Sequence, residues 1–270
     1  MRDLAVHSSS GQANLVSTPV DTQAIRMEEA ALNATTVREQ MLYDGWLVRW
    51  APAAAKRARS VNVIAAPHRD LDEKLAFCNA VYARAQLPPV FRLTSVCPDP
   101  ALDAQLDARG LRRFGDSCVM AVPLRARRAE SLAATLRYDH EPAARFAAIA
   151  GALRGQAAEH VSEHARRLAT IAVPCIRMAA RDDDGRPVAT GMVVVDGDVA
   201  GIFDVVVHAD ARRRGYARHL MHRLTDEAYQ AGARAAYLQV EYANAAARRL
   251  YASLGFSDRY AYWYRTHEHK

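Results

Sequence analysis

A basic segment between a strand-like run and a helix-like run carries residue types that bind a diphosphate group. It comprises Val205, Val206, Val207, Arg212, Arg213, Arg214, Gly215, Tyr216 and Ala217. The first turn of a helix leaves backbone N–H groups without partners, its dipole attracts anions, and small residues let an anion approach closely. The segment therefore predicts a pyrophosphate cradle, and the alternative is an ordinary strand-to-helix turn with surface arginines. It contains neither a Walker A loop nor a Gly-x-Gly-x-x-Gly fingerprint.

A second block further along the chain has the pattern of a capped helix followed by a strand. Its residues are Asn244, Ala247, Leu250, Tyr251, Gly255 and Phe256. Asn is a preferred residue at the start of a helix, and Gly is preferred just after its end. Together the two blocks resemble the GNAT superfamily of acyl-CoA-dependent N-acetyltransferases, whose acetyl-CoA loop reads Gln/Arg-x-x-Gly-x-Gly/Ala. Arg212, Gly215 and Ala217 match that loop, and the resemblance covers residues 173–265.

The resemblance implies an enzyme that moves an acetyl group from acetyl-CoA to a primary amine. Val205 to Val207 would line the pantetheine and acetyl end of the cosubstrate, and a backbone N–H of residues 204–207 would hold the thioester carbonyl. The basic loop and Asn244 would bind the rest of acetyl-CoA. Tyr251 matches the general-acid tyrosine of the superfamily, which protonates the departing thiolate. The alternative for Tyr251 is a packing role beside its leucine neighbours.

The sequence leaves the proton acceptor for the amine open. Peptide N-terminal acetyltransferases of this superfamily often read Leu-Glu-Val before the conserved Asn, whereas this chain has Leu238-Gln239-Val240. Asp204 and Glu241 remain as candidate bases, and a chain of water molecules is an equal alternative. Purely structural or solvated roles compete with catalysis for both carboxylates.

One motif belongs to a different chemistry. Residues 160–164 have the His-x-x-Glu-His order of a zinc peptidase, in which His160 and His164 would hold the metal from one helix face. Neighbouring charges at Glu159 and Arg166 instead indicate a solvated helix face, and no further carboxylate motif supplies a third ligand. We therefore expect no metal. A zinc peptidase would bind zinc stoichiometrically and would not bind CoA.

The first half of the chain resembles the degenerate amino-terminal domain of tandem GNAT proteins. The matching pieces are residues 45–49, 57–61 and 91–92. Residues 66–70 stand where this half would have its phosphate loop, but they contain no glycine and end in an acid. The first half is therefore predicted to bind no CoA, to pack against the second half and to shape the acceptor side.

The elements that would position these residues occur in a repeated order of strand, helix, strand, helix and strand. Predicted strands span 46–50, 60–65, 90–96, 118–124, 173–180, 188–195, 201–207, 237–240 and 256–265, and predicted helices span 21–42, 70–87, 100–109, 142–153, 156–168, 215–231 and 244–254. This order predicts an α/β fold of two tandem GNAT-like domains, with mixed, mostly antiparallel sheets flanked by helices. We assign residues 1–20 to a flexible tail, 21–130 to the degenerate domain and 131–270 to the acetyltransferase domain.

Composition excludes several classes of protein. Half of the 270 residues are hydrophobic and 24% are charged, which is typical of globular domains. No apolar run approaches the ~20 residues that a membrane-spanning helix needs, so we expect no membrane partner. The formal net charge is +6, but the basic residues are mostly arginines interleaved with acids, and we expect no nucleic-acid partner.

The four cysteines lack Cys-x-x-Cys spacing and no export signal precedes them, so reduced thiols in the cytoplasm are expected. Acetyl-CoA and an amine acceptor are the expected partners, with an oligomer left open. A catalytically silent acyl-CoA-binding or sensor protein is the alternative function, which turnover with a suitable amine would distinguish. The sequence does not identify the acceptor.

Overall fold

The computed structural model describes residues 21–53, 55–126 and 136–267. The predicted tail over residues 1–20 and the predicted domain boundary near residue 130 both lie outside these ranges. The first half contains α1 (Thr22–Asn33), β1 (Gln40–Tyr43), β2 (Trp46–Arg49), the 3₁₀ helix η1 (Lys56–Arg59), β3 (Val61–Val63), α2 (Leu71–Arg84), β4 (Phe91–Thr94), α3 (Leu102–Ala108) and β5 (Arg112–Pro123).

The second half repeats the mixture of helices and strands. It contains β6 (Arg137–His140), α4 (Ala143–Arg154), α5 (Ala158–Ala169), β7 (Cys175–Arg181), β8 (Pro187–Asp196), β9 (Val199–Val207), the 3₁₀ helix η2 (Ala209–Ala211), α6 (Tyr216–Gln230), β10 (Ala235–Glu241), α7 (Ala245–Ser253) and β11 (Ser257–Thr266). No helix in the described ranges is long and apolar enough to cross a membrane.

Several local predictions differ from the structure: β1 and β6 were not predicted, and β5 begins at Arg112 where the predicted strand begins at residue 118. The helix expected over residues 21–42 ends at Asn33, and residues 40–43 form β1, which pairs with β2. The turn between the two strands is Asp44-Gly45, where both residues have positive φ angles of 42° and 77°. Asp-Gly at such a turn is a strong hairpin signal, because a two-residue hairpin loop with positive φ at both positions matches the twist of the strands.

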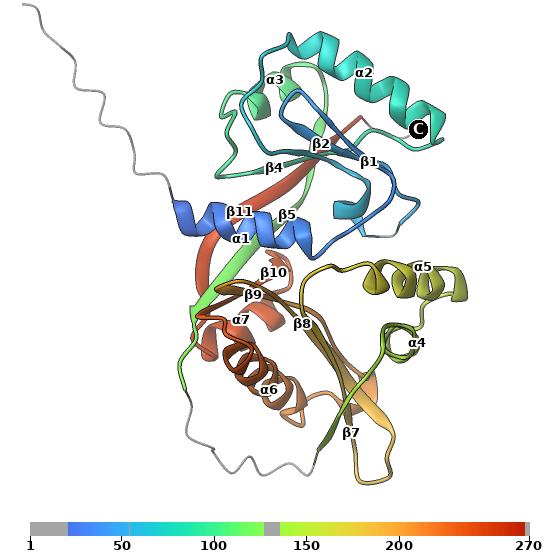
Figure 1. The fold of residues 1–270 in the computed structure, drawn as a ribbon, viewed down its shortest axis with the longest axis vertical. Coiled ribbons are helices and arrows are strands. Elements are labelled where there is room, and N and C mark those ends of the chain that lie inside the picture. Colours follow the sequence, from blue (N-terminus) through green and yellow to red (C-terminus); the bar gives the residue numbers. More distant parts are fainter. Residues whose placement is uncertain (1–20, 54, 127–135, 268–270) are drawn as a thin grey trace, which may run out of the picture.

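The strands of the two halves join in a single sheet of 11 strands, in the order β1-β2-β3-β4-β11-β5-β10-β9-β8-β7-β6. Neighbouring strands are antiparallel except for the parallel pairs β3–β4 and β9–β10. In the middle of the sheet, β11 of the second half lies between β4 and β5 of the first half, and β5 lies between β11 and β10 (Figure 1). The strands of the two halves therefore alternate at their junction.

The predicted fold class, α/β with mostly antiparallel strands and two GNAT-like units, is confirmed, and the structure adds that the two sheets are continuous. β5 has 12 residues and β11 has 10, and each has a hydrogen-bonded neighbour on both edges. Tyr260, Tyr262 and Tyr264 of β11 are buried with Tyr237 of β10 in one apolar cluster. Because alternate strand residues point to the same face of the sheet, these tyrosines of β11 pack together in the interior.

Helices cover both faces of the second half of the sheet. Leu220, Met221 and Leu224 of α6 are buried against one face, in a cluster that includes Val193 of β8. Met192, the residue before Val193, points to the other face, where α4 and α5 pack. Because successive strand residues point to opposite faces, β8 is apolar along nearly its whole length. The strands β8 and β9 are thereby held rigidly between two helical layers.

We predict that cutting the chain after residue 130 leaves the two parts associated. Residues 131–270 alone would expose both edges of β11, and residues 1–130 alone would expose both edges of β5 and one edge of β4. When the two parts are produced together, with an affinity tag on one, they should copurify and melt in one transition. When residues 131–270 are produced alone, they should aggregate or lack cooperative unfolding. A native-like circular dichroism spectrum with a cooperative melt for that fragment alone would contradict the interleaved sheet.

Candidate functional site

The parallel strands β9 and β10 separate partway along their length. They pair from Val199 and Ala235 as far as Ile202 and Leu238. β9 then continues to Val207 and β10 to Glu241 without further pairing to each other. The backbone of β9 beyond Ile202 thus presents N–H and C=O groups that no neighbouring strand takes on this side. Such groups can hydrogen-bond an extended ligand.

The basic loop follows β9 directly and leads into α6. Arg213 and Gly215 have positive φ angles of 66° and 80°, and Gly215 is the residue before the first helical turn. Within the described ranges no side chain caps this turn, so its first N–H groups can bind an anion. Arg212, Arg213 and Arg214 are all exposed around it. The loop thus combines free backbone donors with mobile positive charge.

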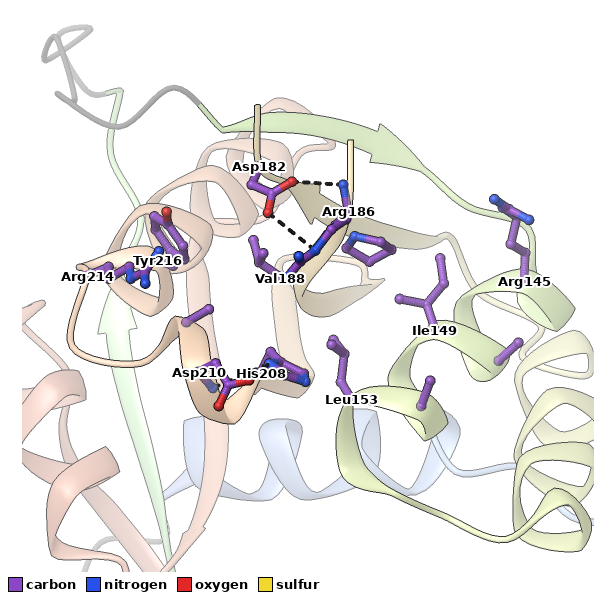
Figure 2. A pocket seen from close by; sticks show the side chains of 14 residues that line it. Arg145, Ile149, Leu153, Asp182, Arg186, Val188, His208, Asp210, Arg214 and Tyr216 are labelled. Atoms are coloured by element: carbon purple, nitrogen blue, oxygen red, sulfur yellow. Dashed lines mark hydrogen bonds and ion pairs between the residues drawn. The ribbon is translucent and has the colours of Figure 1, made fainter. Parts of the chain in front are cut away.

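A groove of about 590 Å³ lies beside this loop. It runs between α4 and the β7–β8 turn, and Arg214 and Tyr216 of the loop and helix α6 line it, together with Leu153 of α4 (Figure 2). On its wall, the backbone N–H of Arg186 donates to Asp182 at 2.8 Å, and the two side chains form an ion pair at 3.9 Å. The loop therefore has open space on its α4 side as well as free backbone donors.

A bulge distorts β9 where it leaves β10. The register between β8 and β9 shifts after the pair Thr190–Val206, and Asp204 has a positive φ of 53°. Thr190 Oγ1 donates to the Asp204 carbonyl at 3.3 Å. Opposite the bulge stands Gly191, where a Cβ would lie 2.6 Å from Leu224 of α6. Strained backbone inside an otherwise regular strand is a common mark of a functional site.

The side chain of Asp204 is held by an arginine and a histidine. Arg154 Nη2 lies 2.8 Å from Oδ1, and His164 Nε2 lies 2.9 Å from Oδ2. Burial alone would raise the pKa of Asp204, but the hydrogen bonds and charges of His164 and Arg154 outweigh it and hold that pKa well below the usual value. A carboxylate with so low a proton affinity is a poor general base. Its geometry suits it to orient His164.

His164 and Arg154 are site residues that the sequence did not single out for this chemistry. His164 is 8% exposed, whereas His160 of the same motif is exposed on the outside of α5. The alternative zinc geometry, in which both histidines face one metal, does not form because His164 contacts Asp204. Among the described residues, no group of three His, Cys, Asp or Glu side chains could hold a metal ion. The sequence did carry a signal for this pair: His164 lies on the buried face of an amphipathic helix, and Asp204 lies on a strand.

Tyr251 lies on the opposite side of the separated strands. It is half-buried on α7 and packs, as Val205 and Val207 do, against the apolar cluster beside α6, with its ring 6.2 Å from the ring of Phe256. Burial raises the pKa of Tyr251 above its usual value, so the phenol stays protonated at neutral pH. The side chain of Asn244 accepts a hydrogen bond from the Ala247 N–H at 3.1 Å and thereby caps α7.

The remaining predicted residues fall in different places. Val206 is half-buried on β9 like its two neighbours, and Ala217 lies in the first turn of α6. Glu241 is exposed at the end of β10, away from the Asp204 contacts. Gln239 on the same strand has both polar side-chain atoms buried and without hydrogen-bond partners. The structure thus brings Asp204 and His164 together and leaves Glu241 facing solvent.

The corresponding loop of the first half is already occupied by its own side chains. The Asp70 side chain accepts from the Asp72 N–H at 2.8 Å at the start of α2. The Asp44 side chain accepts from the backbone N–H groups of His68 and Arg69 at 3.1 and 3.0 Å. The backbone N–H groups that an anion would need are therefore already hydrogen-bonded to carboxylates of the first half itself.

Comparisons with known proteins agree with these features. Residues 153–256 match the acetyltransferase (GNAT) family model. A [ribosomal protein bS18]-alanine N-acetyltransferase from Salmonella typhimurium is 40% identical over 75 residues, which are 28% of this chain and 51% of that protein. The chain thus spans about half the length of the first curated relatives it matches.

Two further relatives extend over most of the chain. The uncharacterized N-acetyltransferase YobR of Bacillus subtilis is 27% identical over 225 residues, covering 82% of this chain and 89% of that protein. A GCN5-related N-acetyltransferase from Kribbella flavida has the same fold, with a TM-score of 0.64 at 20% identity over 92% of this chain and 96% of that one. The matched range, residues 153–256, includes the basic loop, the separated strands and Tyr251. Residues 153–256 thus match the GNAT acetyltransferase family, and the chain as a whole has the fold of a GCN5-related N-acetyltransferase.

Proposed function

We propose that this protein is an acetyl-CoA-dependent N-acetyltransferase that transfers the acetyl group to a primary amine, in the cytoplasm. The separation of β9 and β10 next to the basic loop is the observation that carries the proposal. It gives one continuous path from free helix N–H groups, along an unpaired strand edge, to the bulge at Asp204. A phosphate-bearing thioester needs contacts of these three kinds.

On this proposal, the acetyl-CoA diphosphate binds the first turn of α6 and the arginines around it. Gly215 has no Cβ, so nothing intrudes where the anion must approach the backbone. The pantetheine chain would hydrogen-bond the free edge of β9 between Phe203 and Val207. A backbone N–H on that edge would stabilise the negative charge that develops on the thioester oxygen during attack.

His164 is the proton acceptor that we propose for the incoming amine. Its Nε2 contacts Asp204, which fixes the orientation of the ring and would stabilise its positive charge after proton uptake. The amine must lose a proton to attack, and the carboxylate itself is too acidic to take it. Tyr251, kept protonated by burial, would give its proton to the departing thiolate.

Replacing Gly215 tests the anion site. Gly215→Glu should abolish acetyl-CoA binding, because a carboxylate would enter the anion site and L side chains are strained at φ 80°. The matched control is Gly232→Glu at the other end of α6, where φ is 104° and a Cβ has open space around it. Calorimetric titration measures affinity, and circular dichroism checks the fold. If both variants bound acetyl-CoA with equal affinity, the loop would not be part of the cofactor site.

Removing one hydroxyl tests the proposed acid. Tyr251→Phe keeps the ring and its packing, so affinity for acetyl-CoA should change little. The single-turnover rate should fall by ~10²–10⁴-fold, the usual contribution of a general acid. Tyr229→Phe, which removes a hydroxyl from a half-buried ring on α6, is the control and should keep the wild-type rate. A Tyr251→Phe rate within about threefold of wild type excludes the acid role. A protein that binds acetyl-CoA but turns over no amine would instead be the silent sensor.

Replacing His164 tests the proposed base through its pH dependence. Protonation of a base stops catalysis, so kcat/KM of the wild type should fall towards acidic pH. His164→Gln should lower kcat by ~10²–10⁴-fold and remove that acidic limb. His160 is exposed one turn earlier on α5, so His160→Gln should leave kcat and the acidic limb of the pH profile unchanged. If the acidic limb persists in His164→Gln, another group or a water chain accepts the proton.

A further inference from the structure

Arg57 of the first half reaches the separated strands of the second half. It belongs to η1, and its guanidinium carbon lies 5.4 Å from the ring centre of Phe203 on β9, the residue before Asp204. Its Nη1 is buried and has no hydrogen-bond partner among the described residues. A buried N–H group without a hydrogen-bond partner is costly, and a guanidinium is well shaped to hold a carboxylate through two parallel hydrogen bonds. The position therefore favours an anionic ligand group.

The surroundings of Arg57 carry an excess of positive charge. Burial, and then the charges of Arg57 and Arg92, lower the pKa of Arg49 to about 10, so the three guanidiniums are close enough to repel one another. Glu28 is the carboxylate that faces this cluster, and it is already engaged by Arg92 at 3.0 Å and by the Tyr260 hydroxyl at 2.7 Å. One carboxylate opposite three guanidiniums leaves an anion to be supplied from outside.

A cavity of about 90 Å³ connects Arg57 to the proposed base. It is lined by Arg57 from the first half, by His164 of α5, and by Phe203 and Asp204 of β9. Arg167 also lines it, but its side chain is ion-paired with Glu163. The cavity is small, and its other walls are largely apolar. It accommodates a group of a few heavy atoms with a cation at one end and an Asp–His pair at the other.

We propose that Arg57 binds a carboxylate of the acceptor, and that the acceptor is a small amino acid whose amine lies within one or two carbon atoms of that carboxylate. This assignment rests on the proposed acetyltransferase function. The amine would lie at His164 and Asp204 and the carboxylate at Arg57, with Met192 and Leu168 beside a small apolar side chain. The first half of the chain would then select the acceptor, although its own loop is closed to anions.

The test compares amino acids with their carboxamides, which keep the amine and lose the negative charge. Glycine, L-alanine and β-alanine, and the amides of each, are offered with acetyl-CoA, and CoA thiol release is followed. The acids should exceed the amides by about 10–100-fold in kcat/KM, the range expected for one charged hydrogen-bonded contact. An amide also stands in for a peptide amino terminus, so a preference for amides would point to a protein acceptor.

Variants of Arg57 assign the preference to this side chain. Arg57→Ala should abolish the preference for acids over amides, mainly through a higher KM for the acids. Arg57→Lys keeps the charge without the planar fork and should retain part of the preference. Arg113→Ala is the control, because Arg113 also stacks on an aromatic ring, that of Trp263 at 4.1 Å, but does not line the cavity.

Three results would overturn the proposal: equal rates for acids and amides, an undiminished acid preference in Arg57→Ala, or acetyl-CoA binding without acetylation of any of these probes. Failure of the wild-type protein to bind acetyl-CoA is a separate result, and it would refute the acetyltransferase function itself. If Arg57→Ala fails to fold, the Arg57→Lys variant and the wild-type comparison of acids with amides still decide.

Discussion

The backbone ladder between β5 and β11 is the constraint on which the rest of this structure depends. These two strands come from opposite halves of the chain and lie side by side at the centre of one sheet. β11 joins β4, and β5 joins β10, so neither half completes its sheet alone. Because every backbone N–H and C=O in the interior needs a partner, this arrangement makes the two halves one cooperative unit.

That continuity fixes where the first half can touch the second. The helix α1 is tied to the β8–β9 turn by Arg26, whose Nη2 lies 2.5 Å from Asp196 Oδ1. The segment after β2 then brings η1, with Arg57, over Phe203 of β9. The first half, in which internal carboxylates accept from the backbone N–H groups around the start of α2, therefore still borders the candidate site of the second half.

Charge within the site is arranged in pairs that compensate burial. Asp204 stands on strained backbone, and Arg154 and His164 from the α4–α5 layer hold its carboxylate. Such pairing suits the acidic side chain to orient its partners, and in the proposed mechanism His164 is then the proton acceptor. Tyr251 on the other face has no charged partner that shifts its pKa, and burial alone keeps its proton in place.

The sequence by itself determined the features whose signals are local. Gly215 at the start of α6 and Asn244 at the start of α7 were predicted because caps and turns depend on a few adjacent residues. The α/β fold class followed from hydrophobic periodicity, which is a property of each segment alone. The helix predicted over residues 34–42 was wrong, because the Asp44-Gly45 turn, a local hairpin signal, outweighs helical spacing there, and pairing with β2 completes the strand.

Only the tertiary structure decided which distant residues meet. Asp204 binds Arg154, 50 residues earlier in the chain, and Arg57 stacks on Phe203 from the other half. The placing of β11 between β4 and β5 likewise has no local signal, because ladder hydrogen bonds join backbone groups that are the same in every residue except proline. Contacts between segments far apart in sequence depend on how whole elements pack, and that is why the Asp–His pair and the buried guanidinium emerge from the fold alone.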